Sequence, residues 1–176
     1  LRLEPPQGAI RTTEEIARTL LTSGGRRNHA VPVAWALELP SIDLPLDPYV
    51  LGCWLGDGTT TSGQMTCDVN DAPEIMGAFS DAGFTVTQHR CPKSHGVLAL
   101  TRELRALGVL GNKHIPALYL RAARAQRLAL LQGLMDTDGT VGRDGRHISF
   151  CTTRACLRDD VHELIVSLGW KVGVTE

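Results

Sequence analysis

Two aspartates stand in matching sequence contexts, Asp57 within residues 50–58 and Asp138 within residues 131–139. In both, a glycine is followed by large apolar residues, a small residue, the aspartate and a second glycine. Carboxylate oxygens are the ligands that hard divalent cations prefer, and such a cation activates water for attack on a phosphate ester. The repeated pattern therefore predicts one divalent-cation site that uses both carboxylates.

The segments that carry these aspartates are predicted to be helices. Small residues recur four positions apart in each segment, at Gly52 and Gly56 and at Gly133 and Thr137, so each helix presents them on one face. Two helices can approach closely along such faces because no large side chain separates their backbones. The Asp–Gly pair that ends each helix would then bring the two carboxylates together.

Two other interpretations compete with a metal site for these aspartates. Each is explained on its own as a turn residue that ends a helix, because Asp–Gly pairs are common in turns, but this does not explain why the whole context repeats. A calcium loop beginning at Asp136 is excluded by its later positions. The EF-hand loop needs Gly at position 6 and Glu at position 12, where this chain has Val141 and His147.

Residues 54–58 (WLGDG) and 135–139 (MDTDG) resemble the two motifs of the LAGLIDADG homing endonucleases, in the form found inside inteins. The resemblance implies an α+β fold of two pseudo-symmetric αββαββ halves, with the paired motif helices at their interface. It also implies site-specific, double-strand cleavage of DNA with Mg²⁺. In that family the last Asp of each motif binds the metal and is catalytic. These are Asp57 and Asp138, whereas Asp136 matches Leu55 and is not equivalent.

A third catalytic residue is implied by residues 112–116 (NKHIP), which resemble the block of intein endonucleases that ends in Lys-x-Ile-Pro. In that block the Lys, here Lys113, polarises the attacking water or stabilises the phosphate, and a cation near the metal site suits either task. The alternative is a surface Lys in a loop. The second-half counterpart of Lys113 is expected beyond Glu176, because Lys171 stands at a different place in the repeat.

The family reads DNA with the sheet of each half, laid along the major groove, which admits a two-stranded ribbon. The resemblance therefore implies DNA contacts from the hairpin predicted over residues 84–100 and from the turn and strand predicted over residues 139–151. Arg26 and Arg27 form a small basic cluster near the N-terminus, which is either a phosphate contact or a solvated loop. The expected DNA-binding residues are Gln88, His89, Arg90, Lys93, Arg143, Arg146, Arg26 and Arg27.

The composition is that of a folded domain, since 43% of the 176 residues are hydrophobic. No apolar run reaches the roughly 20 residues of a membrane span. A net charge of −1 does not by itself indicate a nucleic-acid binder, although 15 of the 18 basic residues are Arg, which suits phosphate and guanine; a GC-rich genome would give the same share. Five cysteines without a CxxC pair fit a reducing cytoplasm. Cys53, Cys67 and Cys151 are expected in the core.

The chain is predicted to comprise an N-terminal linker segment (1–46), a first endonuclease half (47–122) and a second half (123–176). The order of elements after Asp57 begins again after Asp138, and residues 169–172 (GWKV) repeat residues 83–86 (GFTV). By this repeat the second half is incomplete, so marginal stability or self-association is expected. The self-splicing part of an intein is not expected here, because it needs a first Cys or Ser and a last Asn.

The expected partner is double-stranded DNA, namely the intein-less allele of a host gene, bound by a monomer that is an internal pseudo-dimer. No membrane partner is expected. The main alternative is a catalytically inactive LAGLIDADG-type module that binds DNA without cutting it. A second alternative is a structural insert with neither activity.

Overall fold

The computed structural model describes residues 8–31, 33–145 and 147–175. The chain divides into two compact units, residues 1–34 and residues 35–176. Among the described residues, no helix has both the length and the apolarity that crossing a bilayer requires. The predicted N-terminal linker segment (1–46) overlaps both of these compact units, because its last twelve residues, 35–46, belong to the second unit.

The first unit contains one short helix, α1 (Thr13–Arg18), followed by a turn that is closed by a bridge between Leu21 and Arg27. A capping box opens this helix, because the Thr12 hydroxyl accepts from the Glu15 backbone N–H and the Glu15 carboxylate accepts from the Thr12 N–H. The described side chains of this unit are exposed, with Ile16 the one that is half-buried. Its fold therefore depends on local hydrogen bonds.

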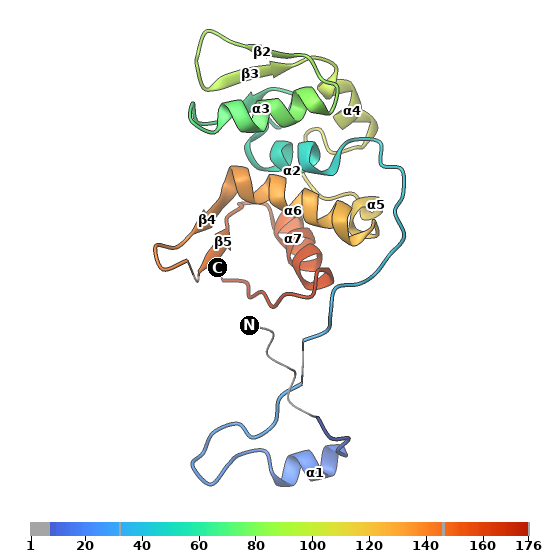
Figure 1. Cartoon of the computed structure of the whole chain (residues 1–176), viewed down its shortest axis with the longest axis vertical. Helices are drawn as coiled ribbons and strands as arrows, with labels where there is room; N and C mark the ends of the chain where they lie inside the picture. Colours follow the sequence, from blue (N-terminus) through green and yellow to red (C-terminus); the bar gives the residue numbers. More distant parts are fainter. Residues whose placement is uncertain (1–7, 32, 146, 176) are drawn as a thin grey trace. The chain divides into compact units, whose positions relative to one another are not determined.

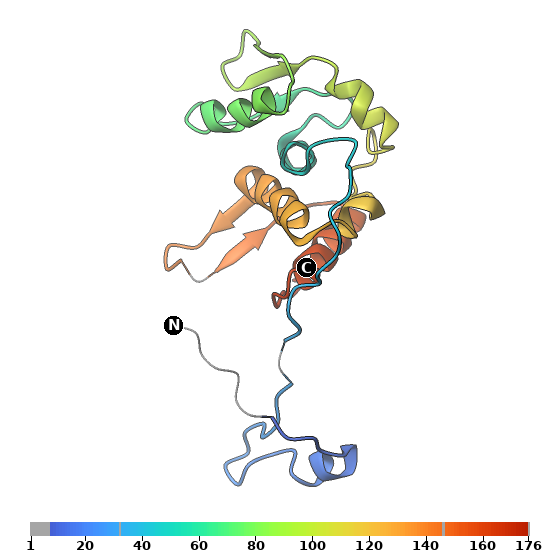
Figure 2. The same cartoon turned by 45° about the vertical axis from the view of Figure 1, so that its right-hand side comes forward.

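The second unit is organised around two helices that pack side by side, α2 (Pro48–Asp57) and α6 (Arg124–Asp138) (Figures 1 and 2). Gly52 and Gly133 make this packing possible. A Cβ atom on Gly52 would collide with the Leu130 carbonyl oxygen, and one on Gly133 would collide with the Tyr49 carbonyl oxygen. The predicted small-residue faces are therefore in direct backbone contact, as two close-packed helices require.

On the α2 side, a small antiparallel sheet packs with helix α3 (Ala72–Asp81). Its strand order is β1-β3-β2, so β3 (Ser94–Val97) lies between β1 (Met65–Thr66) and β2 (Val86–Gln88). Helix α4 (Leu100–Ala106) follows the sheet. The core under this sheet includes Met65 and Phe79, both fully buried.

On the α6 side, β4 (Gly139–Val141) and β5 (Ile148–Phe150) form a two-stranded antiparallel sheet. Helix α7 (Ala155–Ser167) packs against α6 and against the short helix α5 (Ala117–Leu120). The molecule is thus mixed α and β with small antiparallel sheets, as the sequence predicts. Each motif helix is followed directly by strand residues, since the bridge from Gly58 to Met65 mirrors the pairing of Gly139 with Phe150.

An extended segment, residues 37–46, lies along α5 and α6 and is named the strap here (Figure 1). Arg127, fully buried, donates to the carbonyl oxygens of Leu37, Ala122 and Ser167. Gln126 bonds both backbone groups of Ile42, at 3.3 and 2.7 Å. These hydrogen bonds give partners both to the buried guanidinium of Arg127 and to backbone groups of the strap, which has no regular secondary structure. Buried polar groups need such partners.

A third side chain forms hydrogen bonds with the backbone of the strap near its end. The hydroxyl group of Tyr119 accepts from the Leu46 N–H at 3.0 Å and donates to the Leu46 carbonyl oxygen at 2.8 Å. The strap then leads into α2, whose first turn is capped by Asp47. That carboxylate accepts from the backbone N–H groups of Tyr49 and Val50, and Pro48 occupies the first helical position, where it needs no acceptor.

One core expectation is wrong. Cys53 and Cys67 are buried, but Cys151 is exposed. Cys151 follows β5 and lies at the edge of an open groove, so the apolar residues around it in sequence do not enclose it. The burial of a strand residue depends on what covers its face, and the neighbouring sequence does not reveal that.

Candidate functional site

Asp57 and Asp138 are the last residues of α2 and α6, and the structure brings them together at one end of the helix pair. The close packing continues to this end, because a Cβ atom on Gly56 would collide with the Thr137 hydroxyl. Gly58 and Gly139 follow with extended backbone and donate to the carbonyl groups of Trp54 and Met135. Both helices therefore stop at the aspartates and direct the chain into the strands.

Burial and mutual repulsion raise the pKa of the Asp57 carboxyl to about 6, burial being the larger cause, and the nearby Lys113 opposes the rise. The pKa of Asp138 is raised as well, again by burial, with Lys113 opposing. Two carboxylates that are half-buried side by side hold their protons more tightly than in water. A cation between them would remove that repulsion.

Lys113 lies beside the two carboxylates and is buried. Its Nζ donates to the Gly56 carbonyl oxygen at 2.7 Å and lies 5.2 Å from the centre of the Trp54 ring. Burial lowers the pKa of this amine to about 8, with Arg154 adding to the fall and Asp138 and Asp57 opposing it. The alternative of a surface Lys does not describe this side chain.

A small polar pocket opens at this point, with a volume of about 280 Å³. Arg154 is the charged residue of this pocket that the sequence did not predict; it precedes α7, and its guanidinium lies 3.5 Å from the Thr60 hydroxyl. No motif surrounds Arg154 in the sequence, and its place follows only from the packing of α7. The pocket is lined by Leu55, Gly56, Thr60, Lys113, Asp138, Thr152, Thr153, Arg154 and Leu157.

The set of protein ligands at this site is small for a divalent cation. No cluster of three or more His, Cys, Asp or Glu side chains suited to a metal exists among the described residues, so a cation here would have two protein carboxylates. Mg²⁺ commonly uses one or two carboxylates and completes its shell with water and phosphate oxygens. Burial is the main cause of the raised pKa values of Asp57 and Asp138, and the nearby Lys113 opposes it at both. The residues present therefore fit Mg²⁺ together with a phosphate-containing substrate.

The stability of the cation-free protein should fall as the pH rises from about 4 to about 6. The folded Asp57 carboxyl keeps its proton up to a pKa of about 6, but the unfolded one only up to its ordinary 3.8, so deprotonation favours unfolding across this range. Mg²⁺ should reverse the effect near neutral pH and raise the thermal midpoint by about 2–4 °C for each kcal/mol of binding. Thermal unfolding with and without Mg²⁺ measures both.

Asp57→Asn is the matched control for this prediction, because it keeps the shape and removes the charge. It should raise the midpoint of the cation-free protein slightly at neutral pH and abolish the Mg²⁺ effect. An equal Mg²⁺ shift in the variant and the parent would show that the cation binds elsewhere.

Asp136 lies apart from the carboxylate pair, as its mismatch with Leu55 suggests. Its carboxylate accepts from the Tyr49 hydroxyl at 2.9 Å, which links α6 to the first turn of α2. Burial, together with Cys53 and Asp136, raises the pKa of Tyr49 well above its usual value, so this hydroxyl stays a donor. Asp136 thus joins the two helices, and the metal-site prediction does not include it.

Among the described residues of the second unit, the predicted DNA-binding side chains do not line this pocket. Gln88, His89, Arg90 and Lys93 are exposed at the end of the β2–β3 hairpin, where Lys93 pairs with Asp68 at 2.9 Å. The His89 ring lies 3.1 Å from the Gln64 amide. Arg143 is exposed in the β4–β5 turn, and Arg146 lies outside the described residues. Arg26 and Arg27 are exposed in the first unit.

Comparison with known proteins gives two matches. Residues 125–176 match the model of the LAGLIDADG-like domain. Over 165 residues the chain is 46% identical to the replicative DNA helicase DnaB of Mycobacterium intracellulare. That alignment covers 93% of this chain but 26% of the helicase, so the chain spans about a quarter of the relative's length.

Proposed function

We propose that this chain, which matches the LAGLIDADG-like domain over residues 125–176, is a site-specific, double-strand DNA endonuclease of the intein homing type. The observation that carries the proposal is the meeting of Asp57 and Asp138 at the ends of two close-packed helices, with Lys113 buried beside them. A purely structural pair of helix ends does not need two carboxylates that repel each other.

The proposal includes a two-half architecture. Each half consists of a motif helix, strand residues that pair as a hairpin, and a second helix, α3 in one half and α7 in the other. The α2–α6 contact would then lie on a pseudo-twofold axis, which suits a duplex whose two strands are themselves related by a twofold axis. A single chain acting as an internal pseudo-dimer is the corresponding state in solution.

In the proposed reaction a water oxygen bonds to phosphorus as one ester P–O bond breaks, and the leaving oxygen takes up a proton. Mg²⁺ held by Asp57 and Asp138 would supply an activated water and charge stabilisation. Lys113 has one Nζ–H engaged with the Gly56 carbonyl group, so its other protons can bind a phosphate oxygen or the water. The Arg154 guanidinium, in the same pocket, is suited to a second phosphate oxygen.

DNA recognition is proposed for the two hairpins that follow the motif helices. The β2–β3 hairpin presents Gln88, His89 and Arg90 at its exposed end, and the β4–β5 turn presents Arg143. These side chains offer donors for base edges and phosphates. Arg26 and Arg27 belong to the separate first unit and are proposed as further phosphate contacts.

The proposed target is an uninterrupted gene for a replicative helicase. The name of the matched relative and the 26% of its length that aligns support an element inserted within such a protein. Cleavage of the allele without the element would promote its copying into that allele.

The test is incubation of the chain with a supercoiled plasmid that carries the uninterrupted helicase gene, with Mg²⁺ or with EDTA. Linear product with one sequence-defined end pair, formed only with Mg²⁺, is expected. Specific binding without cleavage would instead support the inactive DNA-binding module. If the chain neither binds nor cleaves this DNA, even in salt as low as about 50 mM where phosphate contacts are strongest, the remaining interpretation is a structural insert with neither activity.

Lys113→Met should lower the cleavage rate by about 10²-fold with little change in DNA affinity, because it removes a cation that acts on the reacting phosphate. Met keeps much of the aliphatic packing over Trp54. Single-turnover cleavage and gel-shift assays measure the two effects. Lys171→Met, at an exposed position, is the matched control, and equal losses in both variants would contradict a catalytic role for Lys113.

A further inference from the structure

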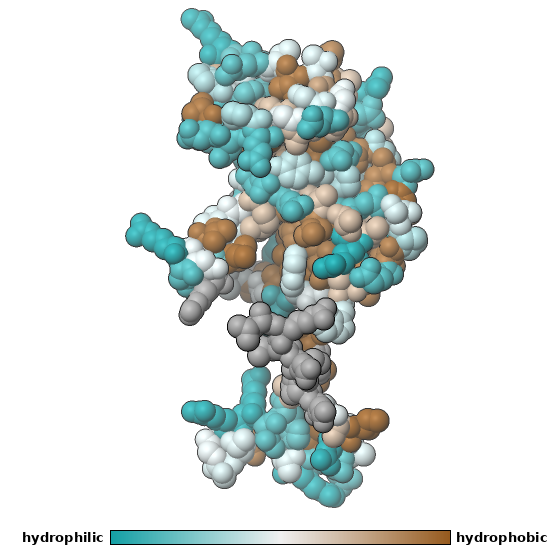
Figure 3. Space-filling model, viewed as in Figure 1, coloured by the Kyte–Doolittle hydropathy of each residue, from teal (hydrophilic) through white to brown (hydrophobic). Residues whose placement is uncertain are grey.

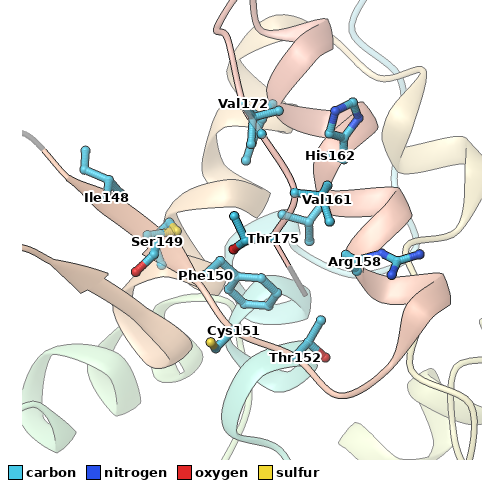
Figure 4. A pocket seen from close by; sticks show the side chains of 14 residues that line it. Ile148, Ser149, Phe150, Cys151, Thr152, Arg158, Val161, His162, Val172 and Thr175 are labelled. Carbon is cyan, nitrogen blue, oxygen red and sulfur yellow. The ribbon is translucent and has the colours of Figure 1, made fainter.

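Helix α7 packs through one face and borders an open groove with another. Leu157 and Leu164 belong to the packed face and are buried in the core. Arg158 and His162 line the groove, which lies beside strand β5 (Figure 4). Figure 3 shows hydrophobic side chains on the neighbouring β4–β5 hairpin, where Val141 is 63% exposed. These two faces leave one side of α7 that neither the core nor the groove explains.

The remaining face of α7 carries Cys156, Asp160 and Glu163. They are four and three residues apart, so they lie in one row along the helix. All three contact the connection between α4 and α6. The Cys156 thiol donates to the Lys113 carbonyl oxygen at 3.4 Å, and the Glu163 carboxylate pairs with Arg121. This row therefore follows the segment that carries the buried lysine of the site.

The strongest bond of the row is made by Asp160. Its carboxylate accepts from the Ile115 backbone N–H at 2.8 Å. Residues 113–116 have no regular secondary structure, and the Ile115 side chain is 2% exposed. A backbone donor in such a place needs an acceptor from another element. Helix α7 supplies it, two residues beyond Lys113.

The other side of the same loop is bound by the segment that follows α2. The Gly111 N–H donates to the Thr60 carbonyl oxygen at 2.8 Å, and the Lys113 Nζ donates to the Gly56 carbonyl oxygen at 2.7 Å. The Thr60 hydroxyl lies 3.5 Å from the Arg154 guanidinium. Residues 111–115, named the lysine loop here, are therefore bound from both sides.

The bonds of the row differ in what they contribute. The side chains of Arg121 and Glu163 are 61% and 47% exposed, and ion pairs of that kind contribute little to stability. The Asp160 bond is different, because a charged acceptor meets a backbone donor of fixed direction. It constrains the path of the lysine loop, whereas the apolar face already holds α7 in the fold.

We propose that Asp160 is a positioning residue for DNA cleavage. By binding the Ile115 backbone it holds the lysine loop so that Lys113 stays beside Asp57 and Asp138. In the two-half architecture Lys113 belongs to the first half and Asp160 to the second. The reacting site is therefore complete only when the two halves are packed together. This assignment rests on the catalytic role proposed for Lys113.

The first test follows the position of Lys113 without DNA. The chain has three lysines, Lys93, Lys113 and Lys171, so a short pulse of acetic anhydride followed by peptide mass spectrometry gives the acetylation rate of each. Asp160→Ala should raise the rate at Lys113 by about tenfold by freeing the loop, with the other two lysines as internal references. Asp160→Asn keeps an acceptor oxygen and should match the parent.

Two further variants complete this test. Asp160→Glu moves the acceptor by one methylene group, so it should also release Lys113, and it keeps the test decisive if Asp160→Ala does not fold. Asp159→Ala is the matched control, because it removes the same side chain one position earlier on α7. Asp159 is exposed and pairs with Arg158, so its loss should leave the acetylation of Lys113 unchanged.

The second test asks whether Asp160 acts through Lys113. Asp160→Ala, or Asp160→Glu in its place, should lower single-turnover cleavage by about 10–100-fold, with DNA affinity unchanged, because a small displacement of a reacting group is costly. In the Lys113→Met background the same substitution should change the rate by less than about twofold. A residue that only stabilises the fold would lower the rate equally in both backgrounds.

Positioning by Asp160 is overturned if Lys113 keeps the parent acetylation rate in both displacing variants, or if Asp159→Ala raises that rate equally. It is also overturned if the loss of cleavage is the same with and without Lys113→Met. A parent chain that never cleaves DNA contradicts the proposed function instead. The acetylation rates then still decide whether Asp160 positions Lys113.

Discussion

Asp57→Asn and Asp138→Asn will each lower the rate of DNA cleavage by at least about 10³-fold while specific DNA binding remains. Each substitution removes one of the two carboxylates proposed to hold the cation, and the described residues contain no cluster of three or more metal-ligating side chains that could replace it. The amide keeps the size of the side chain, and loss of the repulsion between Asp57 and Asp138 favours folding. Cleavage therefore fails through lost chemistry and not through unfolding.

Asp136→Asn is the matched control, because it is the same substitution two residues before Asp138 on helix α6. The remaining amide oxygen can still accept from the Tyr49 hydroxyl, so cleavage within a few-fold of the parent is expected. Single-turnover cleavage at saturating enzyme separates the three variants. A comparable loss in Asp136→Asn, or full activity in Asp57→Asn, would show that the carboxylate pair is structural.

The second large effect concerns the helix pair. Gly52→Ala should destabilise the fold by about 2–3 kcal/mol, because the new methyl group would collide with the Leu130 carbonyl oxygen and lie 2.9 Å from the Leu134 nitrogen. Backbone atoms of a neighbouring helix cannot move aside as a flexible side chain can. The same change should separate Asp57 from Asp138 and lower cleavage.

Gly77→Ala makes the same chemical change in another helix, α3, where a Cβ atom would have no neighbour within 4 Å. There the free energy of unfolding should rise by about 0.5–1 kcal/mol, since alanine favours helix over glycine. Urea unfolding of both variants measures whether the two substitutions change the free energy of unfolding in opposite directions. If both stabilise the protein, the close approach of α2 and α6 does not hold in solution.

The motif helices could be predicted from the sequence because their signals are local. Pro48 after Asp47 sets the start of α2, and Gly58 and Gly139 follow the last helical residues. The repeated four-residue spacing of small residues predicts the face that packs. The meeting of the two carboxylates is then a geometric consequence of two helices of similar context.

Arg154 and the strap could not be predicted in the same way. Arg154 reaches the pocket only because α7 packs beneath α6, and its Thr60 partner is 94 residues away in sequence. Arg127 and Leu37 are 90 residues apart. The exposure of Cys151 depends on an open groove, which no pattern in its own strand encodes. Contacts of this kind follow from the assembled fold.

The strap has a consequence for how such chains can vary. At Leu37, Ile42 and Leu46 the groups that are bound belong to the backbone, and the groups that bind them are the side chains of Arg127, Gln126 and Tyr119. Substitution in the strap leaves those bonds in place, but insertion or deletion of one residue displaces every carbonyl group beyond it. In related chains this segment should therefore accept many residue types at its exposed positions, though not at the buried Leu46, and only one length.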